Sequence, residues 1–132
     1  DQKWVDHYSY ILIAFAHMTD WFLADSELEV ISKKIEFLMS ESNQPYDPEI
    51  VSNKIIKVLA DYRSIPDEDK KVDALFSACS HLKKETWFDH LAATMLLSNL
   101  AEIAEADRKI EKTEIQFLAN IADAFGVDPP RI

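Results

Sequence analysis

Apolar residues recur at intervals of three and four positions along most of this 132-residue chain, which is the period of an amphipathic α-helix. In the first such stretch, Trp4, Tyr8, Ile11 and Phe15 are spaced by four, three and four residues. A single Gly stands against five Pro, a composition typical of a helical protein with few tight turns. The spacing predicts no β-sheet and helices over residues 3–19, 26–39, 48–62, 66–82, 86–106 and 115–125.

Residues that start and stop helices support these boundaries. Asp47 is a capping carboxylate followed by a proline, which is favoured at the first position of a helix. Pro66 opens the next predicted helix, and Thr86 begins the longest one. Gly126 is placed to end the sixth helix, and residues 127–130 carry the start signal of an incomplete seventh.

The length and the helix count predict a single compact all-α domain over residues 1–132, with six or seven helices. The segment 86–106 has the widest apolar arc, so we expect it to be the central, mostly buried helix. That arc consists of Phe88, Leu91, Ala92, Met95, Leu96, Leu100, Ile103 and Ala104. The chain begins at Asp1 rather than Met, which is consistent with a piece of a longer protein.

The charge balance bears on the partners of the chain. Lys and Arg number 14 against 24 Asp and Glu, and the net charge of -10 opposes approach to nucleic acid and to anionic membrane surfaces. The longest uninterrupted apolar run, residues 10–16, is far shorter than the roughly 20 residues that a membrane-spanning helix needs. The single cysteine, Cys79, cannot form an intramolecular disulfide and lies on the apolar face of a predicted helix. These features favour a cytoplasmic protein with no nucleic-acid partner and no membrane span.

An acidic turn, an apolar residue and a glutamate on the next helix occur together twice in the chain. The two copies are Asp20-x-x-Leu23-x-x-x-Glu27 and Asp107-x-x-Ile110-x-x-x-Glu114. A pseudo-repeat of two helical hairpins, one around each turn, explains the pattern. Chance similarity between two helix boundaries explains it equally well, and the sequence leaves both explanations open.

The second turn stands within residues 103–115, of sequence IAEADRKIEKTEI, and the pattern continues through ANIADAFGV at residues 119–127. This stretch resembles the TerB family of tellurite-resistance proteins, whose hallmark is an Asp-Gly turn followed by an apolar residue and then a Glu. The chain departs from that pattern at Trp21 and Arg108, which replace the Gly, so a turn that needs positive φ must take another shape. The resemblance implies an all-helical domain in a stress-response or metal-handling context, often with partner proteins at the membrane. It does not imply an enzyme.

The two turns supply candidate ligands for a divalent cation. These are Asp20, Glu27, Asp107 and Glu114. Ca²⁺ and Mg²⁺ prefer oxygen ligands, and Glu102 and Glu105 favour a weak site at the second turn. The alternative is that the aspartates hydrogen-bond turn amides while the glutamates favour the dipole of the helix that follows. A complete EF-hand is excluded, because the first half of its loop and its central Gly are missing.

Trp21 and Phe22 are unusual residues for a turn that should be exposed. Either they fold back into the core or they form an apolar contact for a protein partner. The second interpretation makes them candidate partner-binding residues.

Motifs for catalysis are missing from the sequence. It has no Gly-rich phosphate loop, no Gly-x-Ser-x-Gly and no zinc-ligand spacing, and no Glu stands three residues before any of the four histidines. We therefore expect no enzyme and no certain cofactor. The chain is predicted to be a TerB-like interaction or metal-responsive module linked to stress or tellurite resistance, and the alternative is a structural adaptor domain of a larger protein that binds no metal.

Overall fold

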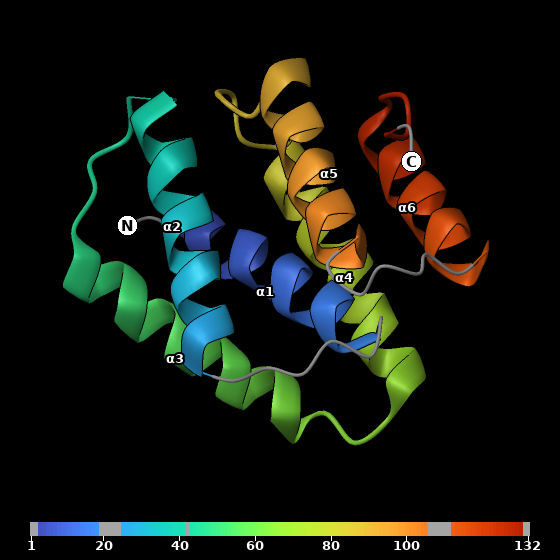
Figure 1. The fold of residues 1–132 in the computed structure, drawn as a ribbon, viewed down its shortest axis with the longest axis horizontal. Helices are drawn as coiled ribbons and strands as arrows, with labels where there is room; N and C mark the ends of the chain where they lie inside the picture. The colour runs from blue at the N-terminus through green and yellow to red at the C-terminus, as the bar shows by residue number, and fades with distance from the viewer. Residues whose placement is uncertain (1–2, 19–24, 42, 106–111, 131–132) are drawn as a thin grey trace.

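The computed structural model describes residues 3–18, 25–41, 43–105 and 112–130 of the chain. These residues form six α-helices and no β-strand (Figure 1). The helices are α1 (Lys3–Met18), α2 (Asp25–Glu41), α3 (Pro48–Ser64), α4 (Glu68–Lys83), α5 (His90–Glu105) and α6 (Lys112–Phe125). The predicted all-α class is confirmed, and residues 127–130 do not begin a seventh helix. No helix in the described ranges is long and apolar enough to cross a membrane.

Aspartate side chains cap the start of three helices. The carboxylate of Asp47 accepts a hydrogen bond from a backbone amide of α3 at 3.0 Å, and that of Asp67 accepts one from α4 at 2.9 Å. Asp89 does the same for α5 at 3.0 Å. Because Asp89 supplies the cap, the fifth helix begins at His90, and the predicted start at Thr86 is wrong.

Two helices end in the same left-handed turn. Gly126 follows α6 with a φ of 69°, and its amide donates to the carbonyl of Asp123 at 3.0 Å. The next amide, that of Val127, donates to the carbonyl of Ala122 at 3.1 Å, which completes a Schellman motif. Asn43 holds the equivalent position after α2 with a φ of 56°, a conformation that Asn adopts more readily than most residues. The cap predicted at Gly126 is confirmed.

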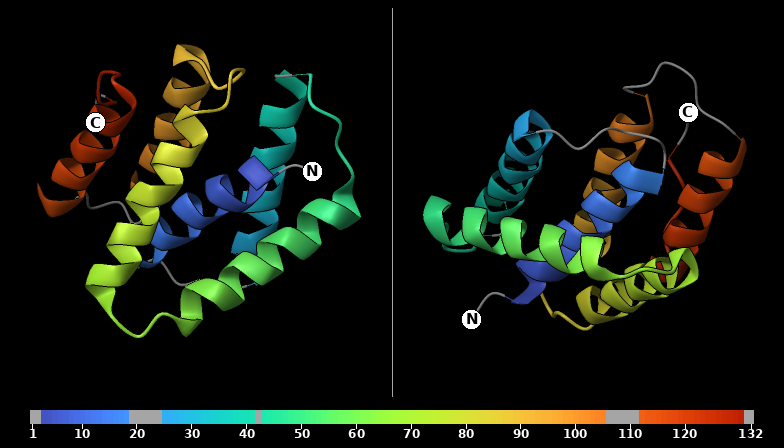
Figure 2. Two further views of the ribbon diagram at one scale, coloured as in Figure 1. Left: turned by 180° about the vertical axis from the view of Figure 1, so that it is seen from behind. Right: turned by 90° about the horizontal axis from the view of Figure 1, so that it is seen from below.

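Helix α1 is the centre of the fold. It runs between one layer formed by α2, α5 and α6 and another formed by α3 and α4, as the two views in Figure 2 show. It packs against α2, α3, α4 and α5, and Phe15 also reaches Phe117 of α6, with ring centroids 5.6 Å apart. The prediction that residues 86–106 form the central helix is therefore wrong.

The position of α1 follows from its apolar run. Residues 11–16 hold no polar side chain, so this part of the helix has no face that favours water, and all six residues are fully buried. Burying a large side chain such as that of Phe15 contributes about 1.5–3 kcal/mol. Helix α5, in contrast, keeps one side in solvent, where Leu91 is 66% exposed. The prediction that Leu91 faces inward is wrong.

The two predicted hairpins correspond to the pairs α1–α2 and α5–α6, and the helices of each pair are in contact. The connecting turns, at residues 19–24 and 106–111, lie outside the described residues. Helices α5 and α6 lie alongside each other, whereas α1 crosses α2 (Figures 1 and 2). This difference argues against close equivalence of the hairpins, and the pseudo-repeat stays a prediction.

Candidate functional site

Most residues predicted from the two acidic turns lie outside the described part of the chain. This applies to Asp20, Trp21, Phe22 and Asp107. Glu27 lies in the first turn of α2, and its side chain is not among those described. The metal-binding and partner-binding roles of these residues stay predictions.

Glu114 is the candidate ligand whose side chain is described. It lies in the first turn of α6, where a carboxylate favours the helix dipole, and the residue is 9% exposed, which is low for a glutamate. Glu102, expected to add a carboxylate near the same turn, instead forms an ion pair with Lys34 of α2. Among the described residues, no group of three His, Cys, Asp or Glu side chains is placed to hold a metal ion.

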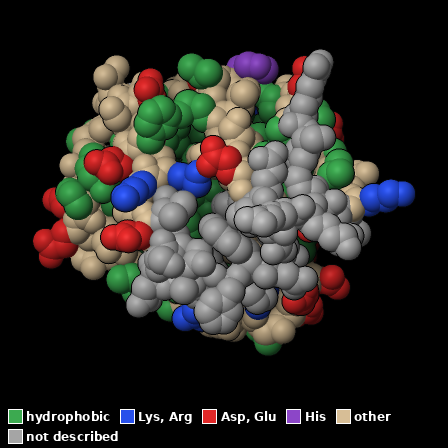
Figure 3. Space-filling model, in the orientation of Figure 1, with side chains coloured by type: hydrophobic (Ala, Val, Ile, Leu, Met, Phe, Trp, Pro, Cys, Tyr) green, Lys and Arg blue, Asp and Glu red, His purple; other side chains and the backbone are tan. Residues whose placement is uncertain are grey.

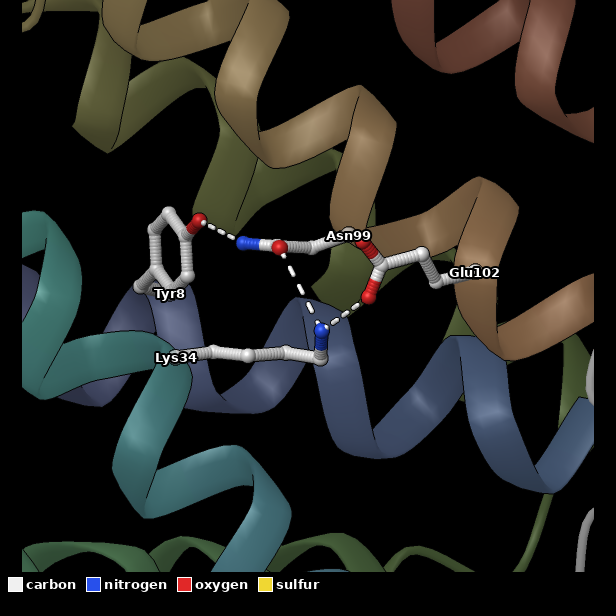
Figure 4. A network of polar contacts seen from close by, with 4 residues as sticks. All are labelled: Tyr8, Lys34, Asn99 and Glu102. Carbon is white, nitrogen blue, oxygen red and sulfur yellow. Dashed lines mark hydrogen bonds and ion pairs between the residues drawn. The ribbon is translucent and has the colours of Figure 1, made fainter.

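A chain of polar contacts joins α1, α2 and α5 (Figure 4). Nδ2 of Asn99 donates a hydrogen bond to the hydroxyl of Tyr8 at 2.8 Å. Nζ of Lys34 donates to Oδ1 of Asn99 at 3.5 Å and to a carboxylate oxygen of Glu102 at 2.5 Å. Because an ammonium group can only donate, Lys34 holds the oxygen of the Asn99 amide toward itself and leaves the nitrogen for Tyr8. Burial raises the pKa of Tyr8, so its hydroxyl stays protonated.

Two separate hollows lie between α2 and α5 beside this network, and each is lined by an exposed apolar side chain. We call the pair of hollows the α2–α5 groove, defined by Lys33, Phe37, Glu41, Leu91, Met95 and Asn99. Phe37 is 58% exposed, and Met95 lies one helical turn from Leu91 and one from Asn99. One hollow, of 330 Å³, lies beside Phe37 and Asn99, and the other, of 230 Å³, lies beside Leu91 and Met95. Figure 3 shows hydrophobic and charged side chains next to one another on this face.

The two ends of the groove differ in charge. Lys33 and Lys34 line one end together with Glu102, so basic side chains outnumber acidic ones there. Glu41 and Asp89 line the other end, and none of the residues described around that hollow is basic. Glu41 follows Lys33 by eight positions, which separates these ends by about 12 Å along α2.

The sequence matches the family described as tellurite resistance protein TerB over residues 54–132. The match covers more than half of the chain and includes α4, α5, α6 and part of α3. The chain belongs to the TerB family. Comparisons with curated proteins and with solved structures gave no match. The TerB match includes Asp107, Glu114 and the α5 side of the groove, whereas α1 and α2 precede it.

The TerB chain has another hollow, of 240 Å³, on the side of α3 and α4. We call it the α1–α4 crevice, and its lining includes Asp6, His7, Val58, Asp61, Ala78 and His81. The rings of His7 and His81 stack with centroids 4.6 Å apart and planes 10° from parallel. Burial and the neighbouring His81 lower the pKa of His7 below its ordinary value of 6.5, against the opposing effect of Asp6. His7 is therefore mostly neutral at pH 7.

Cys79 is a core residue of this TerB domain, as the sequence predicts. It is buried within α4, and burial raises the pKa of its thiol to about 12. A thiol with such a pKa stays protonated at neutral pH and is a poor nucleophile. Burial also raises the pKa of Tyr62 to about 12, so this hydroxyl is no acid or base near pH 7.

Sequence reasoning missed the α2–α5 groove. Phe37 follows Ile35 by two positions and so lies off the apolar stripe of its helix, which is a signal that could have identified it as exposed. Leu91 carries no such signal, because it falls within the apolar arc of α5. Only the positions of the neighbouring helices leave Leu91 in solvent.

Proposed function

We propose that this TerB domain is a non-enzymatic interaction module that binds a partner protein in the α2–α5 groove. The observation that carries this proposal is the exposure of Phe37 and Leu91 at the rim. Single exposed apolar residues are common on protein surfaces. These two, together with Met95, line two neighbouring hollows between the same pair of helices, and helical proteins receive apolar side chains of a partner in such hollows.

Two further features favour binding over catalysis. The buried, protonated thiol of Cys79 removes the only cysteine as a nucleophile. The net charge of -10 disfavours nucleic acid as the partner and favours a protein that carries basic residues. Membership of the TerB family supports a role linked to tellurite resistance or stress.

Site-specific cross-linking tests the proposal. A photo-reactive amino acid is placed at position 37, 91 or 56 of separate chains, and each chain is irradiated in its source cells. Ile56 of α3 is the matched control, because it is an exposed apolar residue outside the groove. We expect one discrete cross-linked protein from positions 37 and 91 and none from position 56. Equal cross-linking from all three positions would show that the groove is not a binding site.

The same experiment separates a module that binds a separate protein from an adaptor domain. If the chain is part of a longer protein, an adaptor role predicts cross-links from position 91 to another segment of that same polypeptide. An interaction module predicts cross-links to a separate chain. Mass spectrometry of the cross-linked peptides distinguishes the two results.

A metal-responsive role is a second candidate function, and the low exposure of Glu114 supports it. A carboxylate at the entrance of α6 that is largely removed from water is suited to meet a cation at the neighbouring acidic turn. Ca²⁺ or Mg²⁺ binding at Asp107 and Glu114 is tested by the titration described in the Discussion.

A further inference from the structure

We infer that the occupant of the α2–α5 groove is an amphipathic α-helix of another protein, with basic residues at the end that meets Glu41 and an acidic residue at the end that meets Lys33. This inference rests on the proposed function and specifies the partner that the groove takes. It is carried by the spacing of the apolar residues and by the order of the charges along the groove.

The apolar residues of the groove match the period of a helix. Leu91 and Met95 lie one turn apart on α5 and line one hollow together with Glu41 of α2, whereas Phe37 of α2 lines the other hollow together with Asn99. A docked helix presents apolar side chains at positions i, i+3 or i+4 with a similar separation, so one side chain can enter each of the two hollows. The distance of about 12 Å between the charged ends corresponds to little more than two helical turns.

The charges of the groove give the docked helix a direction. Glu41 and Asp89 attract basic side chains at one end, while Lys33 attracts an acidic side chain at the other. Lys34 contributes less to this attraction, because it already contacts Glu102 and Asn99. Reversing the helix would place like charges together at both ends, so the groove selects one orientation.

A second copy of this chain fits the groove poorly. Each copy carries a net charge of -10, so two copies repel each other. This repulsion favours a separate protein with a basic helix as the occupant.

A display selection tests the inference. The library contains helices of about three turns with leucines fixed at helical spacing, and the positions at each end are varied among Lys, Glu and Ser. We expect selection on the 132-residue chain to enrich helices with Lys at one end and Glu at the other. Their binding should weaken about tenfold or more when Phe37→Ser and Leu91→Ser are combined, and it should be unchanged by the matched control Ile56→Ser.

The charge order is tested separately with Glu41→Lys, because Asp89 also caps α5. This variant should weaken the selected helices and favour clones with Glu at the formerly basic end. Circular dichroism and the melting temperature show whether each variant keeps its fold.

The possible results separate the two proposals. The selected helices could lose binding to the Phe37→Ser and Leu91→Ser variant and yet have no preference for Lys at one end and Glu at the other. That result would overturn this inference and leave the groove as a binding site. Both proposals would be overturned if the enriched helices bound the variant with Phe37→Ser and Leu91→Ser as tightly as the native chain. They would also be overturned if no helices were enriched. Concentration-dependent dimers in sedimentation, lost with Phe37→Ser, would show that a second copy is the occupant and would also overturn the inference.

Discussion

Two of the hollowed surfaces of this domain differ in where their large apolar side chains lie. In the α1–α4 crevice, the buried side chains of Val58 and Ala78 form an apolar floor, and the polar residues Asp61, Ser77 and His81 stand exposed at the rim. This is the usual order of a protein surface, in which apolar atoms lie inward and polar atoms face water.

The α2–α5 groove differs, because large apolar side chains are exposed at its rim. Phe37 and Leu91 line it in this way, while Asn99, which also lines it, donates a hydrogen bond to the buried hydroxyl of Tyr8. The hydrogen bond satisfies the buried hydroxyl of Tyr8, whereas Phe37 and Leu91 keep apolar surface in contact with water. Folding alone explains the layering of the crevice, whereas the exposed apolar side chains of the groove are the basis for the proposed binding role.

Shortening one leucine in each part of the domain tests the contrast most strongly. Leu75→Ala in α4 should lower the free energy of unfolding by about 2–5 kcal/mol, because Leu75 is fully buried and its loss leaves a cavity. Leu91→Ala should change it by at most about 0.5 kcal/mol, because the side chain already lies in solvent. Denaturant titrations measure both values. A loss of several kcal/mol for Leu91→Ala would show that the rim belongs to the core and would remove the contrast.

The contribution of the hydrogen bond between Asn99 and Tyr8 is tested by removing one hydroxyl. Tyr8→Phe should lower the free energy of unfolding by about 1–2 kcal/mol, because the Asn99 amide then loses its partner in the interior. Tyr10→Phe is the matched control on the crevice side, where the hydroxyl donates to the carbonyl of Lys71 at 3.2 Å. That carbonyl lies inside α4 and can already accept a helical hydrogen bond, so the control should lose less. If the free energy of unfolding fell equally in both variants, the two tyrosine hydroxyls would contribute equally to stability, and the two sides of α1 would not differ in this way.

The crevice should respond to pH through His7. Burial and His81 lower the pKa of His7 in the folded state, whereas in the unfolded chain it has the ordinary value of 6.5. The unfolded chain therefore binds more protons below that value, so the stability contributed by neutral His7 is present above pH 6.5 and is lost as the pH falls. The charged groups that face His7 are His81, Glu85, Asp6 and Lys3, and the two carboxylates oppose the shift.

Two measurements check this pH dependence. The difference in stability between the native chain and His7→Gln should change between pH 7 and pH 5, and an NMR titration of His7 should move toward its ordinary pKa in His81→Gln. The Phe37→Ser variant in the groove should leave the titration of His7 unchanged. A His7 pKa of 6.5 or higher in the native chain would contradict the prediction.

The smallest expected effect is cation binding at the second acidic turn. Calorimetric titration of Ca²⁺ in moderate salt should show weak, saturable binding, with a dissociation constant on the order of a millimolar, because few ligands are present and Arg108 and Lys109 add positive charge. Asp107→Asn and Glu114→Gln should each remove it. Glu41→Gln, at the acidic end of the groove, is the matched control and should have no effect. Binding that fades with monovalent salt would be diffuse attraction to the acidic chain and not a site.

Much of the fold was predictable because helix boundaries are encoded locally. Asp47 before a proline and Gly126 after an apolar stripe identify a start and an end without knowledge of any distant residue. The prediction of the central helix was wrong, because the width of the apolar arc on a helix does not show how many neighbouring helices cover it. The uninterrupted apolar run at residues 11–16 was the better signal, because a helix segment without a polar face must be enclosed.

The candidate site was less predictable, because it depends on contacts between distant parts of the chain. Tyr8 and Asn99 are separated by 91 positions, and no local pattern indicates that their side chains meet. The stacked pair of His7 and His81 is a further case, since both residues look like ordinary helix-surface histidines in the sequence. The ligands predicted at Asp20 and Asp107 came from a local motif, which can indicate a turn but does not show which side chains converge there.

The single cysteine is buried, so the rate at which a thiol reagent labels it measures how often the surrounding structure opens. A thiol reagent cannot reach Cys79, which is 1% exposed, until part of the structure around α4 separates. With rapid closing, the labelling rate under native conditions gives the free energy of that separation. If this value is lower than the free energy of global unfolding, α4 separates as a local unit. If the two are equal, the domain opens only as a whole.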